Sequence, residues 1–191
     1  MTYHYFAMLS RMKHIRRWGL MRNTRTENLS EHSLETAFIA HALCKINNVR
    51  LGGNLNADRA AVLAMFHDTT EILTGDMPTP IKYNNPEIKN AYKEIEKSAA
   101  KSLLSMLPDD IKKEYEPIYY GEDKALEKIV HAADKISALI KCIEERNMGN
   151  KEFAVAEVST LNAIKNLHLP EVEIFLNEYL ESYGLTLDEQ K

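Results

Sequence analysis

Apolar side chains recur at spacings of three and four residues along almost the whole chain, and this periodicity predicts an all-α fold. No segment shows the sustained alternation of apolar and polar residues that is typical of a half-buried strand. The pattern is clearest in GEDKALEKIVHAADKISALIKCIEERNMG, where a long helix should end shortly before Gly149. We therefore expect a bundle of helices with little room for strands.

Capping residues indicate where several of these helices begin and end. Ser30 and Asn56 are expected to cap the second and third helices, and Asn85 with Pro86 should start the fourth, which Pro108 should stop. The expected helices cover residues 3–17, 30–47, 57–73, 86–108, 122–146, 151–167 and 171–183.

Length and composition indicate one globular domain over residues 1–191. A chain of 191 residues, 45% of them hydrophobic, can bury one substantial core, and no repeat or flexible linker marks a second domain. The net charge of -4 argues against a partner that is a nucleic-acid polymer, although a small basic pocket could still bind one phosphate.

The N-terminal residues MTYHYFAMLSRMKHIRRW lack the apolar block of a signal peptide, and no stretch approaches the ~20 apolar residues of a membrane span. We expect a cytoplasmic protein that does not bind membranes. Cys44 and Cys142 lie inside apolar helical patterns, which favours reduced core thiols, with a disulfide as the alternative.

The stretch MFHDTTEILTGDMPTP, residues 65–80, concentrates groups that can bind a metal ion or move a proton. His67 and Asp68 are adjacent on a predicted helix and point about 100° apart, yet both can reach an ion beside that helix. Two ligands are too few for a divalent ion, and His32 and Asp134 on other predicted helices are further candidates. This mixed nitrogen and oxygen set suits Mn, Co, Fe, Ni or Zn.

Several candidate residues, including Glu71 and Asp76 of the same stretch, also have an ordinary structural interpretation. Taken alone, His32 would be a solvated residue in a first helical turn, Glu71 a surface residue and Asp76 a turn residue. Asp134 lies at the edge of an apolar stripe, where an unpaired carboxylate is costly, so it needs either a metal ion or a core Arg or Lys as partner.

The order of His32, His67-Asp68 and Asp134 resembles the H…HD…D signature of the HD-domain phosphohydrolases. The stretches FAMLSRMKHIRRWGLMRNTRTENLSEHS, LGGNLNADRAAVLAMFHDTTEILTGDMPTPIKY and HAADKISALIKCIEE are similar to those of the bacterial YfbR-type 5′-deoxynucleotidases, from about residue 3 to at least residue 145. The C-terminal helices, at about 151–183, carry no motif that can be matched.

The resemblance implies a single helical HD domain that forms a homodimer. Each subunit would bind one divalent metal ion, such as Co, Mn, Zn or another first-row transition metal. As a phosphoric monoester hydrolase, it would convert deoxyribonucleoside 5′-monophosphates to deoxynucleoside and phosphate in nucleotide salvage or pool control.

The same resemblance implies a role for each site residue. The metal ligands would be His32, His67, Asp68 and Asp134, of which His32, Asp68 and Asp134 would also border the substrate. Glu71 and Arg17 would be catalytic, and the phosphate and sugar would be bound by Arg17, Trp18, Asp76, Met77, Pro78 and Thr79. On physical grounds Glu71, three residues after Asp68, can reach a water molecule without binding the metal itself, and Arg17 offers a planar charged fork to phosphate. Arg17 and Trp18 could equally be a helix-dipole partner and a core anchor.

Two alternatives stay open. Another HD-domain nucleotide phosphohydrolase could share the signature, although the GYP tripeptide of cyclic-dinucleotide phosphodiesterases is absent from the sequence. A catalytically silent metal-binding or nucleotide-binding module could share the scaffold, but such a module has no need of Glu71.

Overall fold

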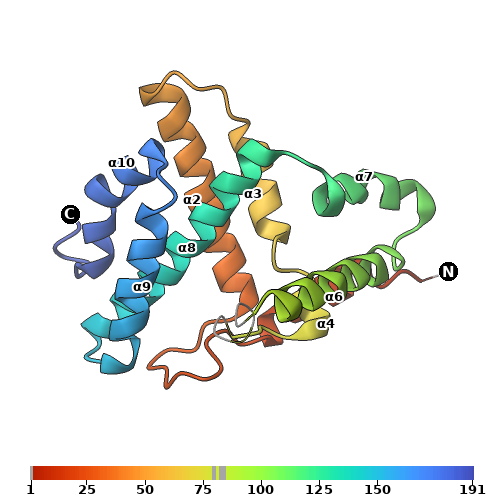
Figure 1. The fold of residues 1–191 in the computed structure, drawn as a ribbon, viewed down its shortest axis with the longest axis horizontal. Helices are drawn as coiled ribbons and strands as arrows, with labels where there is room; N and C mark the ends of the chain where they lie inside the picture. Colours follow the sequence, from red (N-terminus) through yellow and green to blue (C-terminus); the bar gives the residue numbers. More distant parts are fainter. Residues whose placement is uncertain (1, 79–80, 82–84) are drawn as a thin grey trace. The chain divides into compact units, whose positions relative to one another are not determined.

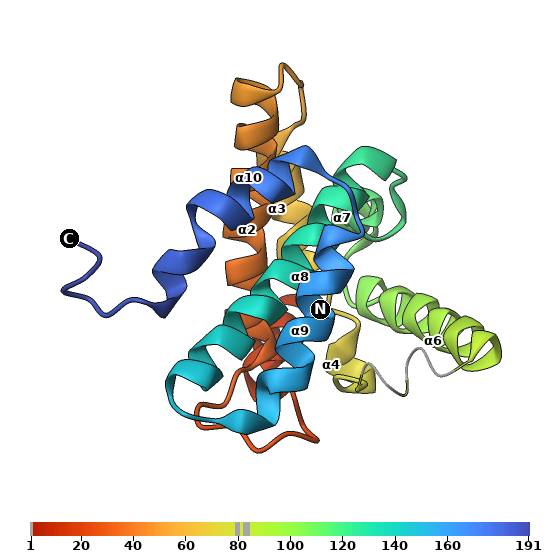
Figure 2. The same ribbon diagram turned by 60° about the vertical axis from the view of Figure 1, so that its left-hand side comes forward.

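The computed structural model describes residues 2–78, 81 and 85–191 and forms two compact units. The first unit is made of Met1–Leu20, Thr26–Ser33 and Phe66–Glu122, and the second of Met21–Arg25, Leu34–Met65 and Asp123–Lys191. Helices supply the regular structure of the described residues, apart from an isolated antiparallel bridge between Arg16 and Asn28 (Figures 1 and 2). The predicted all-α fold is confirmed.

The first unit contains α1, η1, α4, α6 and α7 and the beginning of α2. Their bounds are Tyr5–Leu9 (α1), Ser10–His14 (η1), Leu29–Arg50 (α2), Glu71–Thr74 (α4), Pro86–Leu104 (α6) and Asp109–Tyr120 (α7). Two small apolar clusters hold this unit together. One gathers around Tyr5 and Leu103, and the other joins Met12, Leu29 and Ile72. These clusters hold the segments that carry the candidate site.

The second unit contains the rest of α2 together with α3, α8, α9 and α10. The remaining bounds are Ala57–Phe66 (α3), Lys124–Asn147 (α8), Lys151–Phe153 (η2), Ala154–Lys165 (α9), Pro170–Glu178 (α10) and Leu180–Gly184 (η3). α8 packs along α9 (Figures 1 and 2). The buried apolar side chains of α8 belong to the largest apolar cluster of the described residues. Within the described ranges, every helix is too short or too polar to traverse a lipid bilayer.

Both cysteines are free and buried, which confirms the prediction of reduced core thiols. Burial raises the pKa of Cys44 to about 11. The thiol therefore stays protonated at neutral pH and behaves as a small apolar core residue.

The sequence predicted some helix ends correctly and others wrongly. The side chains of Asn56 and Asn85 do cap α3 and α6, each accepting a bond from a backbone N–H three residues later. The cap of α2, however, is Asn28 and not Ser30. The Asn28 Oδ1 atom accepts bonds from the backbone N–H groups of Ser30 and Glu31, at 3.0 and 3.1 Å, and Glu31 Oε2 in turn accepts a bond from the Asn28 N–H. This reciprocal pair is a capping box.

Three predicted helix lengths are also wrong. The helix predicted over 3–17 is α1 followed by the tighter 3₁₀ turn η1, and the helix predicted to reach Pro108 ends at Leu104. The helix predicted over 57–73 stops at Phe66, because the backbone N–H groups of Thr69, Glu71, Ile72 and Leu73 bond to carbonyls three residues earlier. Such bonds tighten the chain into 3₁₀ turns. In addition, α7 was not predicted.

Candidate active site

The His67-Asp68 pair lies in the tight turns between α3 and α4 and not inside a helix. The next residue, Thr69, anchors these turns: its hydroxyl donates to the Phe66 carbonyl at 2.8 Å and also lies within hydrogen-bond distance, 3.1 Å, of the Tyr119 hydroxyl. Tyr119 on α7 in turn shares a 2.8 Å hydrogen bond with Tyr5 on α1. Two helices of the first unit therefore hold the turn that presents His67 and Asp68.

His32 lies in the first turn of α2, directly after the capping box, and its side chain is fully buried. Its Nε2 atom is 3.5 Å from the Asp68 Oδ2 atom, and the His67 Nε2 atom is 3.2 Å from the same oxygen. The two imidazole rings lie 5.2 Å apart between centroids. The cap of α2 and the turn after α3 thus bring His32 close to the adjacent residues His67 and Asp68, which gathers three predicted ligands.

The donor atoms of His32, His67 and Asp68 all lie within 4.8 Å of one another, so one ion could contact all three. Two imidazole nitrogens and one carboxylate oxygen are ligands that first-row transition metals accept. The residues present therefore fit a divalent metal ion of this kind.

Arg17 reaches this cluster from the segment before α2. Its Nη1 atom donates to Asp68 Oδ2 at 3.2 Å, while its Nε atom donates to Glu27 Oε2 at 3.2 Å. The backbone pairs in the same region, since the Arg17 N–H bonds to the Glu27 carbonyl and the Leu29 N–H to the Ile15 carbonyl. This short antiparallel pairing places Arg17 opposite Glu27.

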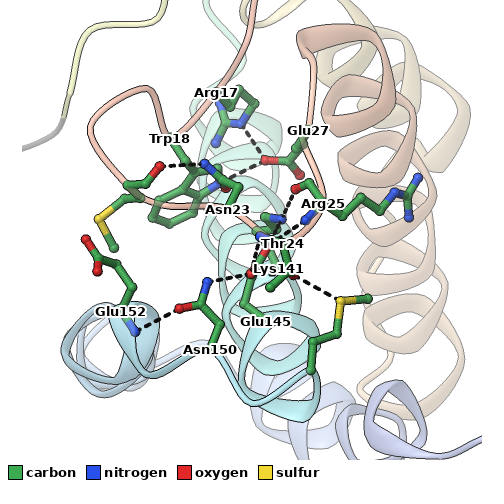
Figure 3. Close-up of polar contacts among 12 residues, drawn as sticks. Arg17, Trp18, Asn23, Thr24, Arg25, Glu27, Lys141, Glu145, Asn150 and Glu152 are labelled. Atoms are coloured by element: carbon green, nitrogen blue, oxygen red, sulfur yellow. Dashed lines mark hydrogen bonds and ion pairs between the residues drawn. The ribbon is translucent and has the colours of Figure 1, made fainter.

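Trp18 has an unusual backbone conformation, with φ of 59° in the left-handed region. For a residue with a large side chain this conformation costs roughly 1–2 kcal/mol, so other contacts must offset it. The Trp18 indole Nε1–H donates to Glu27 Oε2 at 2.8 Å (Figure 3), and the Trp18 backbone N–H donates to Asp76 Oδ2 at 3.2 Å. Both ends of the residue are therefore held.

Asp76 follows Gly75, whose φ of 74° turns the chain after α4. Burial raises the pKa of Asp76 above its ordinary value and the nearby Asp68 carboxylate adds to this, whereas Arg17 and the Trp18 N–H favour the ionised form. Asp76 thus shares an electrostatic environment with the candidate metal ligands, as expected if the loop borders the same site.

Glu71 is the first residue of α4 and is only 4% exposed. Its N–H bonds to the Asp68 carbonyl at 3.0 Å, so the tight turn, and not a shared helix flank, keeps it near Asp68. The sequence-based argument from one continuous helix is therefore wrong, although the two residues are neighbours as that argument required.

The remaining predicted residues are placed less fully. Met77 and Pro78 are half-buried and continue the loop after Asp76. Thr79 lies outside the described residues. Asp134 is a half-buried residue of α8 in the second unit, and its assignment as a metal ligand stays a prediction.

Glu27 was missed in the sequence, although it contacts two predicted site residues. The signal for it is weak, because a glutamate in the loop sequence NTRTEN looks like a solvated residue until the backbone pairing of Arg17 with Glu27 is known. Thr69 and Tyr119 were missed for the same reason, since their hydroxyls meet only through the fold.

Solved structures identify the fold. The chain superposes on the crystal structure of an HD-domain phosphohydrolase from Listeria innocua with a TM-score of 0.82 and 25% identity, over 94% of this chain and 88% of that one. It also matches the fold of a cyanophage S-2L HD phosphohydrolase, described as bound to dA and one catalytic Zn²⁺ ion, with a TM-score of 0.69 and 16% identity over 95% and 99% of the two chains. The fold, together with the cluster of His32, His67 and Asp68, is that of an HD-domain phosphohydrolase.

Within that class, the sequence profile described as 5′-deoxynucleotidase YfbR-like matches residues 4–183, and the chain belongs to this family. Named 5′-deoxynucleotidases of Photobacterium profundum and Vibrio vulnificus are 52% and 50% identical to it over 188 residues, which is 97% of each chain. The family predicted from the sequence is confirmed.

Proposed function

We propose that this protein is a 5′-deoxynucleotidase that uses one divalent metal ion to hydrolyse deoxyribonucleoside 5′-monophosphates to deoxynucleoside and phosphate. The observation that carries the proposal is the close similarity, 52% identity over 97% of both chains, to a named 5′-deoxynucleotidase. The clustering of His32, His67 and Asp68 beside Arg17 supports it independently.

His32, His67 and Asp68 would hold the metal ion, with Asp134 as the fourth ligand that the family resemblance implies. When bound, a divalent ion of this kind withdraws charge from a phosphoryl oxygen and makes water more acidic. Co, Mn and Zn are the candidate metals, since each accepts mixed imidazole and carboxylate ligands.

Arg17 is the proposed phosphate-binding residue. Its guanidinium is permanently charged and can present two parallel N–H groups to phosphate oxygens. Bonds to Glu27 and Asp68 already restrain it in this structure, so little side-chain entropy remains to be lost when substrate binds.

Glu71 is the proposed proton carrier. As the oxygen of a water molecule bonds to phosphorus, a carboxylate oxygen of Glu71 accepts the water proton. The bond between phosphorus and the 5′-oxygen breaks, and the same carboxyl group returns the proton to the 5′-oxygen. Proton transfer of this type contributes typically ~10²–10⁴-fold to rate.

Trp18 and the loop of Asp76, Met77, Pro78 and Thr79 are the proposed sugar-side residues. We propose that Trp18 limits the space beside C2′, so that a ribonucleotide would bury its 2′-hydroxyl without a partner. Such burial costs about 1–3 kcal/mol, or roughly 10- to 100-fold in specificity.

A screen of metals against substrates tests the function. The protein, loaded separately with Mn, Co, Zn or Mg, is incubated with dAMP, AMP and a deoxyribonucleoside 3′-monophosphate, and released phosphate is measured. Release from dAMP in clear preference to the other two supports the proposal. No release with any metal would overturn it and favour a silent binding module.

We also propose that the protein is a cytoplasmic homodimer, as the family resemblance implies. Light scattering during gel filtration should give about twice the chain mass of 21.9 kDa. A mass of one chain at micromolar concentration would contradict the proposal.

A further inference from the structure

A single oxygen atom of Glu27 connects the two residues proposed to bind phosphate and sugar. Glu27 Oε2 accepts the Nε–H of Arg17 at 3.2 Å and the indole Nε1–H of Trp18 at 2.8 Å (Figure 3). The Arg17 and Glu27 side chains are each only 12% exposed, so solvent competes weakly for these bonds. Neither the sequence motifs nor the proposed chemistry assigns Glu27 a task.

The position of Glu27 is itself fixed by the fold. The Glu27 carbonyl accepts the Arg17 N–H at 3.0 Å, and the next residue, Asn28, caps α2. Backbone pairing on one side and a capping box on the other fix the main chain from which the Glu27 side chain projects. The carboxylate is therefore a hydrogen-bond acceptor of defined position for both Arg17 and Trp18.

Trp18 needs stabilising hydrogen bonds of this kind, because its left-handed backbone conformation is unfavourable for a residue with a Cβ atom. The Asp76 carboxylate holds the backbone N–H, and the Glu27 carboxylate holds the far end of the indole. Observed strain at a site is the type of outlier from which a functional constraint can be inferred.

We propose that Glu27 is a positioning residue that orients the Arg17 guanidinium and the Trp18 indole together, so that phosphate binding and discrimination against a 2′-hydroxyl depend on one carboxylate. This inference rests on the proposed function of Arg17 and Trp18. It predicts that loss of Glu27 weakens both properties at once, whereas loss of either partner alone affects chiefly one.

The first test uses fluorescence, because Trp18 is the single tryptophan of the chain and its emission reports on this site alone. Glu27→Ala should shift the emission maximum and increase quenching by acrylamide, since the indole loses its hydrogen-bond acceptor. Glu27→Gln retains a carbonyl oxygen that can accept both bonds, and its emission should lie close to that of the wild type. The matched control is Glu94→Ala, which removes a glutamate that is exposed on α6 and paired with Lys97.

The second test uses kinetics on the metal-loaded enzyme. For Glu27→Ala we expect KM for dAMP to rise roughly tenfold and the ratio of kcat/KM for dAMP to that for AMP to fall by a similar factor, with metal content unchanged. Glu27→Gln should restore most of both properties, and Glu94→Ala should leave both unchanged. Glu27→Asp, which withdraws the carboxylate by one methylene, should resemble Glu27→Ala and serves if the alanine variant does not fold.

The outcomes separate this inference from the proposed function. If the wild type releases phosphate from dAMP but Glu27→Ala and Glu27→Asp keep its emission, KM and substrate ratio, the positioning role is wrong and the function stands. A variant that changes KM without changing the emission or the ratio would also overturn it, because Glu27 would then act on Arg17 alone. If the wild type releases no phosphate, the function itself fails, and the fluorescence test still reports whether Glu27 orients Trp18.

Discussion

Asp68 is the residue on which the candidate site converges, since one of its oxygens lies within 3.5 Å of nitrogen atoms of His32, His67 and Arg17. Asp68→Ala or His67→Ala should therefore abolish both bound metal and phosphate release, because each removes a ligand from a small donor set. Elemental analysis of the purified variants measures the metal. The control is His41→Ala, which removes a partly exposed histidine that pairs with Asp58. Full metal occupancy in the Asp68 or His67 variant would refute the ligand assignment.

Glu71 should behave differently from the ligands. Glu71→Ala and the isosteric Glu71→Gln should keep the metal and lose turnover by roughly 10²-fold or more, because neither side chain can accept the proton of the attacking water. The measurements are kcat for dAMP and metal content on the same preparation. Normal turnover in the glutamine variant would show that the buried carboxylate is not the proton carrier.

Arg17→Lys should be harmful although the charge is retained. The guanidinium bonds to Glu27 through Nε and to Asp68 through Nη1, and one ammonium group cannot reproduce this fork or its two-point contact with phosphate. We expect KM for dAMP to rise by about tenfold or more. Arg50→Lys, which alters a partly exposed pair with Glu178, is the control. Unchanged KM in Arg17→Lys would move the phosphate-binding role to another residue.

Part of this site could be read from sequence and part could not. His67 and Asp68 are adjacent, and the residue types of His32, Glu71 and Arg17 suit the roles proposed for them, so a sequence motif identifies all five. Glu27 could not be found in that way. Its contacts depend on the pairing of residues 15–17 with 27–29 across a loop, and no local pattern encodes which residues of two loop segments will face each other.

At the scale of elements, Asn28 and Ser30 offer a direct choice between two caps for α2. Asn28→Ala should lower the free energy of unfolding by about 1 kcal/mol, because it removes the acceptor for the Ser30 and Glu31 N–H groups. For a chain of this length that corresponds to a fall in Tm of about 2–4 °C. Ser30→Ala should change Tm little. Thermal unfolding followed by circular dichroism measures both Tm values. A larger fall in Tm for Ser30→Ala than for Asn28→Ala would show that Ser30 is the cap, as the sequence predicted.

Helix caps and helix lengths differ in how far sequence predicts them. Asn56 and the Asn85-Pro86 pair were predicted correctly because a cap is a contact between residues three positions apart. The end of α3 was not, because the 3₁₀ turns at residues 66–74 are stabilised by Thr69 and its contact with Tyr119 on a distant helix. α7 was missed because Pro117 lies inside it, which normally argues against a helix, although Tyr115 and Tyr119 on one face pack against the cluster around Tyr5.

At the scale of the whole molecule, the second unit holds a buried ion pair to which no proposed catalytic step assigns a role. Lys141 and Glu145, one turn apart on α8, are 4% and 1% exposed and form an ion pair. Glu145 also accepts bonds from the Thr24 N–H and hydroxyl and from the Asn150 amide, and Lys141 donates to the Arg25 carbonyl (Figure 3). The pair therefore ties residues 24 and 25 to α8.

This network should make stability depend on pH in the acid range. Burial alone would raise the pKa of Glu145, but the bonds from Lys141, Thr24 and Asn150 outweigh it and hold the pKa well below its ordinary value of about 4.5. Because the unfolded chain binds this proton more readily, the stabilisation is fully present above about pH 4.5 and is lost as the pH falls toward the folded-state pKa.

Glu145→Gln leaves the Lys141 charge buried without its partner, and at pH 7 it should cost about 3–5 kcal/mol of unfolding free energy. Urea denaturation at pH 7, 5, 4 and 3 measures the difference in unfolding free energy between the wild type and Glu145→Gln. This difference should shrink as the pH falls. The surface variant Glu94→Gln should have the stability of the wild type at each pH. A difference between wild type and Glu145→Gln that stays constant down to pH 3 would mean that the pKa of Glu145 is the same in the folded and the unfolded chain, so that the network does not favour its ionised form.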